Sequence, residues 1–215
     1  MPLDKRRHYT HAKGEYMKEL DYFYVDGELG WNQNRFPGWA MRNGGCAAVT
    51  ACDLCICLAR QKRFSALYPF DPFHVEKQEY LAFSEKMKPY LHPRWQGIDT
   101  LELYLSGLLD YWRDAGISSL LGRGLPGTAS WQQAKEEIRK QVDSSLPVPC
   151  LLLYHTNSAF KDFQWHWFNI AGYEEFDGEF YVKAITYGSF FWMNLQELWD
   201  TGHRRKGGLI QIEMR

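Results

Sequence analysis

The sequence lacks the segments that would direct the chain into or across a membrane. Its 215 residues contain no run of 18 or more apolar residues, so we expect no membrane-spanning segment. The first 24 residues carry basic side chains but no apolar core, and they do not resemble a secretory signal peptide. The expected localisation is therefore cytoplasmic.

An excess of charge of one sign is also missing. The chain has 25 Lys and Arg against 26 Asp and Glu, which gives a formal net charge of -1 at pH 7. A protein whose main partner is nucleic acid or an anionic membrane usually carries a strong basic surplus, so we expect neither partner. Internal repeats and low-complexity linkers are absent from the sequence, and we expect a single domain over residues 1–215.

The cysteine pattern fits neither a disulfide framework nor a metal site. The count is odd and four of the five lie within residues 46–57, which favours free thiols in a reducing compartment. Cys52, Cys55 and Cys57 cannot all face one metal ion from a single helix, and the sequence has no second cluster of ligands with suitable spacing. We therefore expect no metal and no cofactor. The five cysteines are Cys46, Cys52, Cys55, Cys57 and Cys150.

Apolar periodicity predicts a mainly helical part, residues 1–145. The helix over 46–63 has a nearly continuous apolar sequence and should be buried on all sides. Ser130 and Gln133 match a capping box at the start of another helix. Residues 20–45 and 122–127 are rich in glycine and are expected as loops, the second without the preceding strand that a phosphate-binding loop requires. The other expected helices span 75–90, 99–115 and 130–142.

The second part, residues 146–215, has the short apolar runs typical of strands. Asp177-Gly178 is a strong hairpin signal between two of these runs, so we expect antiparallel neighbours. Helices followed by strands predict an α+β fold. The expected strands span 148–154, 164–173, 180–187, 190–193 and 209–214, with one helical turn over 194–199.

Gly44-Gly45-Cys46 places a thiol directly after two glycines, at the start of the buried helix. Backbone N–H groups and the helix dipole favour an anion at this position, which stabilises a thiolate. The glycines allow another chain to approach the sulfur closely. Cys46 is therefore a candidate nucleophile. The alternative is a cysteine that only packs in the core, as most helical cysteines do.

A thiol nucleophile needs a base, which the fold and not the sequence brings near it. His166 is the best candidate among the seven histidines, because it lies in an expected strand between Trp165 and Trp167. Large neighbours would hold its imidazole in one orientation and shield it from water. The alternative is a buried histidine whose nitrogens only satisfy hydrogen bonds of the core.

The order of these features resembles the papain-like cysteine peptidase fold. It is most similar to the compact bacterial branch that includes the double-glycine leader peptidases of bacteriocin exporters. Two segments carry the resemblance, residues 33–48 with Gly-Gly-Cys and residues 147–199 with His-Trp-Phe-Asn-Ile-Ala-Gly-Tyr and a later Thr-Tyr-Gly. The resemblance implies a central cysteine-bearing helix packed on a mainly antiparallel sheet.

The resemblance also implies roles for individual residues. Cys46 would be the nucleophile and His166 the base and acid, while Gln33, the only Gln before Cys46, would donate to the oxyanion. Gln33 lies thirteen positions before Cys46, farther than is usual in the family. The family places an Asn or Asp on the strand after the hairpin to orient the histidine, and Thr186 is the nearest polar match here. Asn169 should face the other side of its strand from His166.

Two functions fit these residues. The first is a thiol-dependent hydrolase, a peptidase or amidase, that acts on a peptide or small amide through a covalent acyl-enzyme. The second is a catalytically weak or inactive papain-like domain that binds a peptide or another partner. The absence of an Asn or Asp partner for the histidine favours the second function, because a hydroxyl stabilises the imidazolium less than a carboxylate does.

Overall fold

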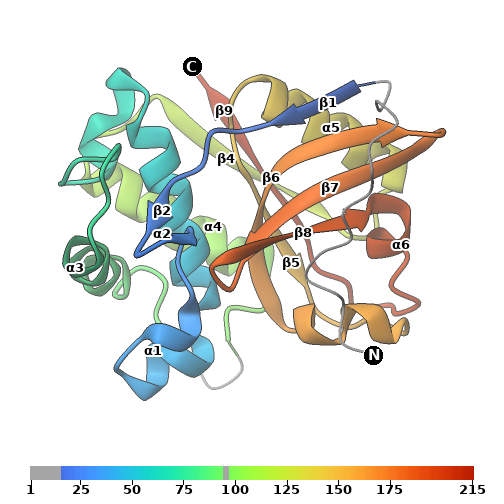
Figure 1. The fold of residues 1–215 in the computed structure, drawn as a ribbon, viewed down its shortest axis with the longest axis horizontal. Helices are drawn as coiled ribbons and strands as arrows, with labels where there is room; N and C mark the ends of the chain where they lie inside the picture. The colour runs from blue at the N-terminus through green and yellow to red at the C-terminus, as the bar shows by residue number, and fades with distance from the viewer. Residues whose placement is uncertain (1–15, 94–96) are drawn as a thin grey trace.

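The computed structural model describes residues 16–93 and 97–215 and has the expected α+β fold. Helices of the N-terminal part, among them the cysteine-rich α2, pack on a C-terminal antiparallel sheet. Figure 1 shows α1 to α4 gathered at one side of the molecule and the sheet at the other. Within the described ranges, no helix is both long and apolar enough to cross a membrane.

The helices follow the periodicity of the sequence closely. α2 is buried along almost its whole length, as its apolar sequence predicts, and it ends at Ala59 before the short 3-10 helix η2 (Lys62–Leu67). Ser130 and Gln133 form the expected capping box at the start of α5. The α-helices are α1 (Trp39–Gly44), α2 (Cys46–Ala59), α3 (Lys77–Met87), α4 (Leu101–Asp114), α5 (Trp131–Asp143) and α6 (Leu195–Trp199).

The sheet has seven strands in the order β4-β9-β5-β6-β7-β8, and β1 also pairs with β6. All of these pairs are antiparallel. Asp177 and Gly178 have positive φ angles of 51° and 77° in the β6–β7 turn, as the hairpin signal predicts. The strands are β1 (Tyr16–Glu19), β4 (Leu120–Pro126), β5 (Val148–Leu152), β6 (His166–Phe176), β7 (Glu179–Thr186), β8 (Ser189–Asn194) and β9 (Gly208–Met214).

The prediction of a loop over 122–127 is wrong, because most of this segment forms β4 and pairs with β9. Its glycines let helix α4 lie close to the strand. A Cβ atom added at Gly122 would lie 2.6 Å from Leu105, and one added at Gly124 would lie 3.1 Å from Leu101. Glycine in this strand therefore marks a close helix contact and not a loop.

The prediction of a long loop over 20–45 is also wrong. The segment contains the two-stranded hairpin β2 (Tyr24–Val25) and β3 (Glu28–Leu29), the 3-10 helix η1 (Gln33–Arg35) and α1. The β2–β3 turn is Asp26-Gly27, and both residues have positive φ. Strands of two residues are too short to show an alternating pattern, so only the Asp-Gly turn marked them.

A side chain of α5 completes the hydrogen bonding of β9. Gln141 is buried, its Nε2 donates to the carbonyl oxygen of Ile212 at 2.9 Å, and its Oε1 accepts from the Ile212 N–H at 2.9 Å. The amide of Gln141 thus pairs with Ile212 as a neighbouring strand would. This contact fixes α5 on the sheet.

We expect Gln141→Leu to lower the free energy of unfolding by about 2–4 kcal/mol, because it leaves a buried N–H and a buried carbonyl of Ile212 without partners. Urea denaturation followed by circular dichroism measures the change. Gln132→Leu on the exposed side of α5 is the matched control and should shift stability by less than about 0.5 kcal/mol. Equal effects of the two substitutions would contradict this role for Gln141.

Candidate functional site

Cys46 is the first residue of α2, and the backbone before it is tightly turned. The N–H of Gly45 donates to the Met41 carbonyl oxygen at 3.0 Å and ends α1, while the Gly45 carbonyl accepts from Val49 in the first turn of α2. A Cβ atom at position 45 would collide with the carbonyl oxygen of Met41. Glycine at this position therefore lets two helices meet directly at the thiol.

The thiol of Cys46 is buried against the start of β6. The residue is 7% exposed, and burial raises the pKa of the thiol. The backbone N–H groups of Trp167, Ala47 and Cys46 act on the pKa in the opposite direction. Because Trp167 directly follows His166, the sulfur lies beside the first residues of the histidine-bearing strand.

His166 and Thr186 are in direct contact. His166 begins β6 and Thr186 ends β7, and the imidazole Nε2 lies 2.7 Å from the Thr186 Oγ1 in a buried hydrogen bond. Burial lowers the pKa of His166 to about 3, so the ring is neutral at physiological pH. The hydrogen bond occupies Nε2 and leaves Nδ1 as the nitrogen that can exchange a proton with another group.

Tyr187 also belongs to this site, although we did not predict it from the sequence. Its ring stacks on the His166 imidazole with centroids 4.6 Å apart and an interplanar angle of 8°. Its hydroxyl donates to the Asp162 carbonyl oxygen at 3.0 Å. Burial, followed by the charges of Cys46 and Asp162, raises the pKa of Tyr187 to about 12. The signal that could have identified it is its place in the Tyr-Gly turn directly after Thr186.

The structure does not join all four predicted residues. The hydrogen bonds of residues 16–93 and 97–215 include none between the Cys46 thiol and the His166 imidazole. Tyr187 is related to both groups, because it stacks on His166 and lies within electrostatic range of Cys46. The arrangement is a closed site in which thiol and imidazole are both neutral.

Gln33 lies in η1 and points toward the end of α1. It is 9% exposed, and its Nε2 donates to the Arg42 carbonyl oxygen at 2.8 Å. Its Oε1 is buried and has no hydrogen-bond partner. The side chain is thus held against the turn that precedes Cys46, with one N–H of its amide engaged. Its role as an oxyanion donor stays a prediction.

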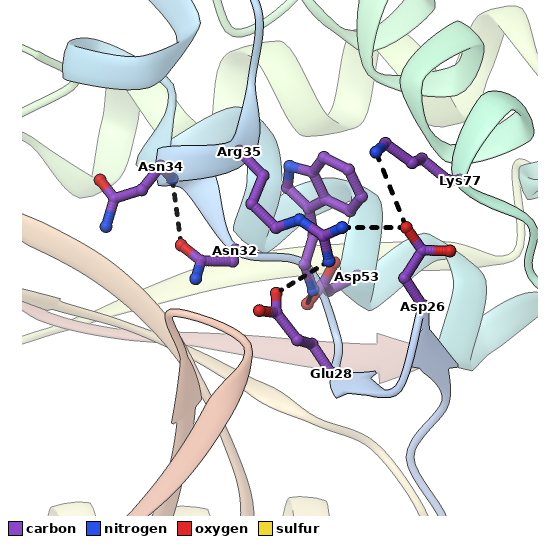
Figure 2. Close-up of polar contacts among 8 residues, drawn as sticks. Asp26, Glu28, Asn32, Asn34, Arg35, Asp53 and Lys77 are labelled. Atoms are coloured by element: carbon purple, nitrogen blue, oxygen red, sulfur yellow. Dashed lines mark hydrogen bonds and ion pairs between the residues drawn. The ribbon is translucent and has the colours of Figure 1, made fainter.

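An ion cluster around Arg35 supports the elements that flank the site. The Arg35 guanidinium contacts Asp26 at 2.9 Å and Glu28 at 3.4 Å, as Figure 2 shows. The N–H of Leu29 donates to the Gly188 carbonyl oxygen at 3.0 Å. Through these contacts the β2–β3 hairpin connects η1, which carries Gln33, to the turn that carries Tyr187.

The other cysteines lie outside this arrangement. All five are free thiols, and the remaining four are buried or partly buried along α2 and β5. In the part of the chain that the structure describes, no group of three or more His, Cys, Asp or Glu side chains could hold a metal ion.

Comparison with known proteins assigns no family to this geometry. No protein-family model matches the chain, and no curated protein matches it significantly. The interpretation of the site therefore depends on the order of the sequence features and on the contacts around Cys46 and His166.

The two pKa shifts give an expected pH profile for the reaction of Cys46 with iodoacetamide. A thiol with a raised pKa beside a neutral imidazole is protonated at neutral pH, and its thiolate fraction grows tenfold with each pH unit. We expect the alkylation rate at Cys46, followed by fragment mass spectrometry, to increase with pH over the whole range from about pH 5 to pH 9 without reaching a plateau. A rate that levels off below about pH 7 would indicate a preformed thiolate–imidazolium pair and contradict the expectation.

Proposed function

We propose that this chain is a thiol-dependent hydrolase of peptides or small amides, with Cys46 as nucleophile and His166 as base and acid. The hydrogen bond between His166 Nε2 and Thr186 Oγ1 carries the proposal. It fixes the orientation of the ring and satisfies one nitrogen, as the third member of a nucleophile–base–orienter set must. The position of Cys46 at the start of α2, beside the backbone of Trp167, gives further support.

The reaction follows from the atoms present. His166 Nδ1 takes the proton of the Cys46 thiol while its Nε2–H donates to Thr186, and the sulfur attacks the substrate carbonyl carbon. The imidazolium returns the proton to the leaving amine as the C–N bond breaks, which leaves a thioester on Cys46. Water, deprotonated by His166, then hydrolyses the thioester and regenerates the thiol. The backbone N–H of Cys46 and the second N–H of Gln33 are the candidate donors to the oxyanion.

Burial has a clear consequence for this mechanism. Since desolvation disfavours both the thiolate and the imidazolium, forming the charged pair costs free energy before attack. The activated pair therefore forms only when substrate is bound. The expected enzyme is slower than one that holds the ion pair at rest.

The burial of the thiol and the imidazole also favours a second candidate function. A domain whose thiol and imidazole are buried, neutral and not hydrogen-bonded to each other could bind a peptide without cleaving it. The two functions differ in one measurable property. A hydrolase forms a covalent acyl-enzyme on Cys46, whereas a binding domain retains its ligand when Cys46 is removed.

The thiol assignment is tested by substituting single cysteines. We expect Cys46→Ala to abolish labelling by a thiol-reactive peptide aldehyde or chloromethyl ketone, together with hydrolysis of a fluorogenic peptide library. Cys57→Ala, at a partly exposed position farther along α2, is the matched control and should leave both signals unchanged. Labelling that survives Cys46→Ala and disappears with Cys57→Ala or Cys52→Ala would overturn the assignment.

Substitution of Thr186 tests the orienting hydrogen bond. Thr186→Val keeps the shape but removes the acceptor for the buried His166 N–H, so we expect kcat/KM to fall about tenfold to a hundredfold and the free energy of unfolding to fall by about 1–3 kcal/mol. Thr186→Ser keeps the hydroxyl and should retain most of the activity. The orienting role would be wrong if the two variants had equal rates.

A further inference from the structure

We propose that Asp53, Tyr22 and Asn169 position β6 against α2, and that the ionisation state of Asp53 thereby sets the reactivity of Cys46. None of the three touches the sulfur or the imidazole, so they act as positioning residues. The inference rests on the proposed function of Cys46 and His166, and the experiment below separates the two.

The helix side of this network is the Asp53 carboxylate, seven residues after Cys46 in α2. The hydroxyl of Tyr80 in α3 donates to its Oδ1 at 2.7 Å. The hydroxyl of Tyr22 donates to its Oδ2 at 3.2 Å, and the Trp31 N–H lies 3.5 Å from the same oxygen. Three donors from three different segments therefore converge on one buried carboxylate, which Figure 2 shows behind the Arg35 cluster.

The strand side of the network is Asn169, three residues after His166 in β6. Its Nδ2 donates to the Tyr22 hydroxyl oxygen at 3.1 Å and to the Thr50 carbonyl oxygen at 3.0 Å. Thr50 lies one helical turn after Cys46. Asn169 is also two residues after Trp167, whose backbone N–H acts on the Cys46 thiol. The network thus fastens β6 to α2 next to the reactive pair.

Tyr22 is the link between the two sides. Its O–H donates to Asp53, so its oxygen lone pairs are free to accept from Asn169. This direction of donation depends on an ionised Asp53, because a protonated carboxyl must itself donate to one of the oxygens around it. The coupling to Asn169 acts through Oδ2: with the proton on this oxygen the carboxyl donates to the Tyr22 oxygen, the Tyr22 O–H turns away from Asp53, and the arrangement that holds Asn169 is weakened.

The pKa of Asp53 lies close to neutral pH. Burial raises its pKa to about 7, against the lowering effects of the donors from Tyr80, Trp31 and Tyr22. Asp53 therefore changes charge near neutral pH, where the reactive pair itself stays neutral. The titratable groups that face it are phenols of the N-terminal segment, α3 and α4 and thiols of α2, namely Tyr22, Tyr80, Tyr104, Cys52 and Cys57.

The experiment measures the alkylation rate of Cys46 by iodoacetamide between about pH 5 and pH 9, with the modified residue located by fragment mass spectrometry. Plotted against pH, the logarithm of the rate should rise with unit slope both below and above pH 7. The line for the higher pH values should be displaced from the line for the lower values, with the step near pH 7. We expect the upper line to be about threefold to tenfold above the extension of the lower one, since ionised Asp53 holds β6 in place. A direct effect of the Asp53 charge would displace the lines in the opposite direction, because a nearby negative charge disfavours the thiolate.

Two tyrosine variants separate positioning from general packing. Tyr22→Phe keeps the ring but removes the link to Asn169, so we expect a single line with no displacement. Tyr80→Phe removes a donor to Asp53 that has no bond to β6. It should keep the displacement and move it to higher pH by about one unit, because the carboxylate loses a stabilising hydrogen bond. If Tyr22→Phe does not fold, as judged by circular dichroism, Asn169→Ala provides the same test.

The outcomes are distinct. Three results would overturn the positioning role. The first is a displacement that persists unchanged in Tyr22→Phe or Asn169→Ala. The others are a displacement of opposite sign and a single line without displacement for the unsubstituted chain. Hydrolysis of the fluorogenic peptide library by His166→Ala tests the proposed function separately, since the base activates the thiol only when substrate is bound. Hydrolysis unaffected by His166→Ala, with the displacement of the alkylation rate intact, would overturn the function and leave the network coupled only to the thiol.

Discussion

The packing of α2 against β6 is the contact on which the rest of the site depends. The thiol lies at the first residue of one element and the imidazole at the first residue of the other, so any shift between helix and strand changes their separation. Asn169 restrains such a shift through its hydrogen bond to the Thr50 carbonyl. Trp167, two residues before Asn169, holds β6 on another side, because its indole N–H donates to the Ile98 carbonyl oxygen at 2.6 Å and its ring stacks on Tyr104 of α4. The start of β6 is therefore held against α2 by polar contacts and against α4 by aromatic packing.

Burial determines the chemical character of this boundary. Cysteine and histidine in water would need only small shifts to exchange a proton, but here desolvation moves their pKa values apart. Tyr187 contributes to this because its ring covers one face of the imidazole. Tyr187 also has a φ of 54°, a backbone conformation that is costly for a residue with a side chain. The turn that covers the histidine is thus held by hydrogen bonds to the Asp162 carbonyl and to the β2–β3 hairpin, and not by the backbone preference of its own residues.

The sequence predicts those parts of the molecule that local rules control. The buried helix α2, the capping box of Ser130 and Gln133, and the Asp177-Gly178 turn each follow from a pattern within a few residues. The contact of His166 with Thr186 was expected only from the resemblance to papain-like peptidases, and the roles of both residues stay predictions. Features that depend on contacts between distant segments were not predictable. The strand β4 needs its glycines because α4 lies close to it, and the partners of Asp53 come from three segments up to 31 residues away.

The order of the strands has a consequence for the time at which the fold can form. β9 lies between β4 and β5 in the sheet and pairs with both, although it follows both along the chain, more than 80 residues after β4 and more than 50 after β5. Until residues 208–214 have left the ribosome, β4 has no strand to pair with and α5 lacks the backbone that Gln141 binds. A nascent chain can therefore assemble β5 to β8 first, while β4 pairs only after β9 has been synthesised. Cys46, His166 and Thr186 lie on α2, β6 and β7, and β9 pairs with β4 and β5, so the reactive site can form before this side of the sheet is complete.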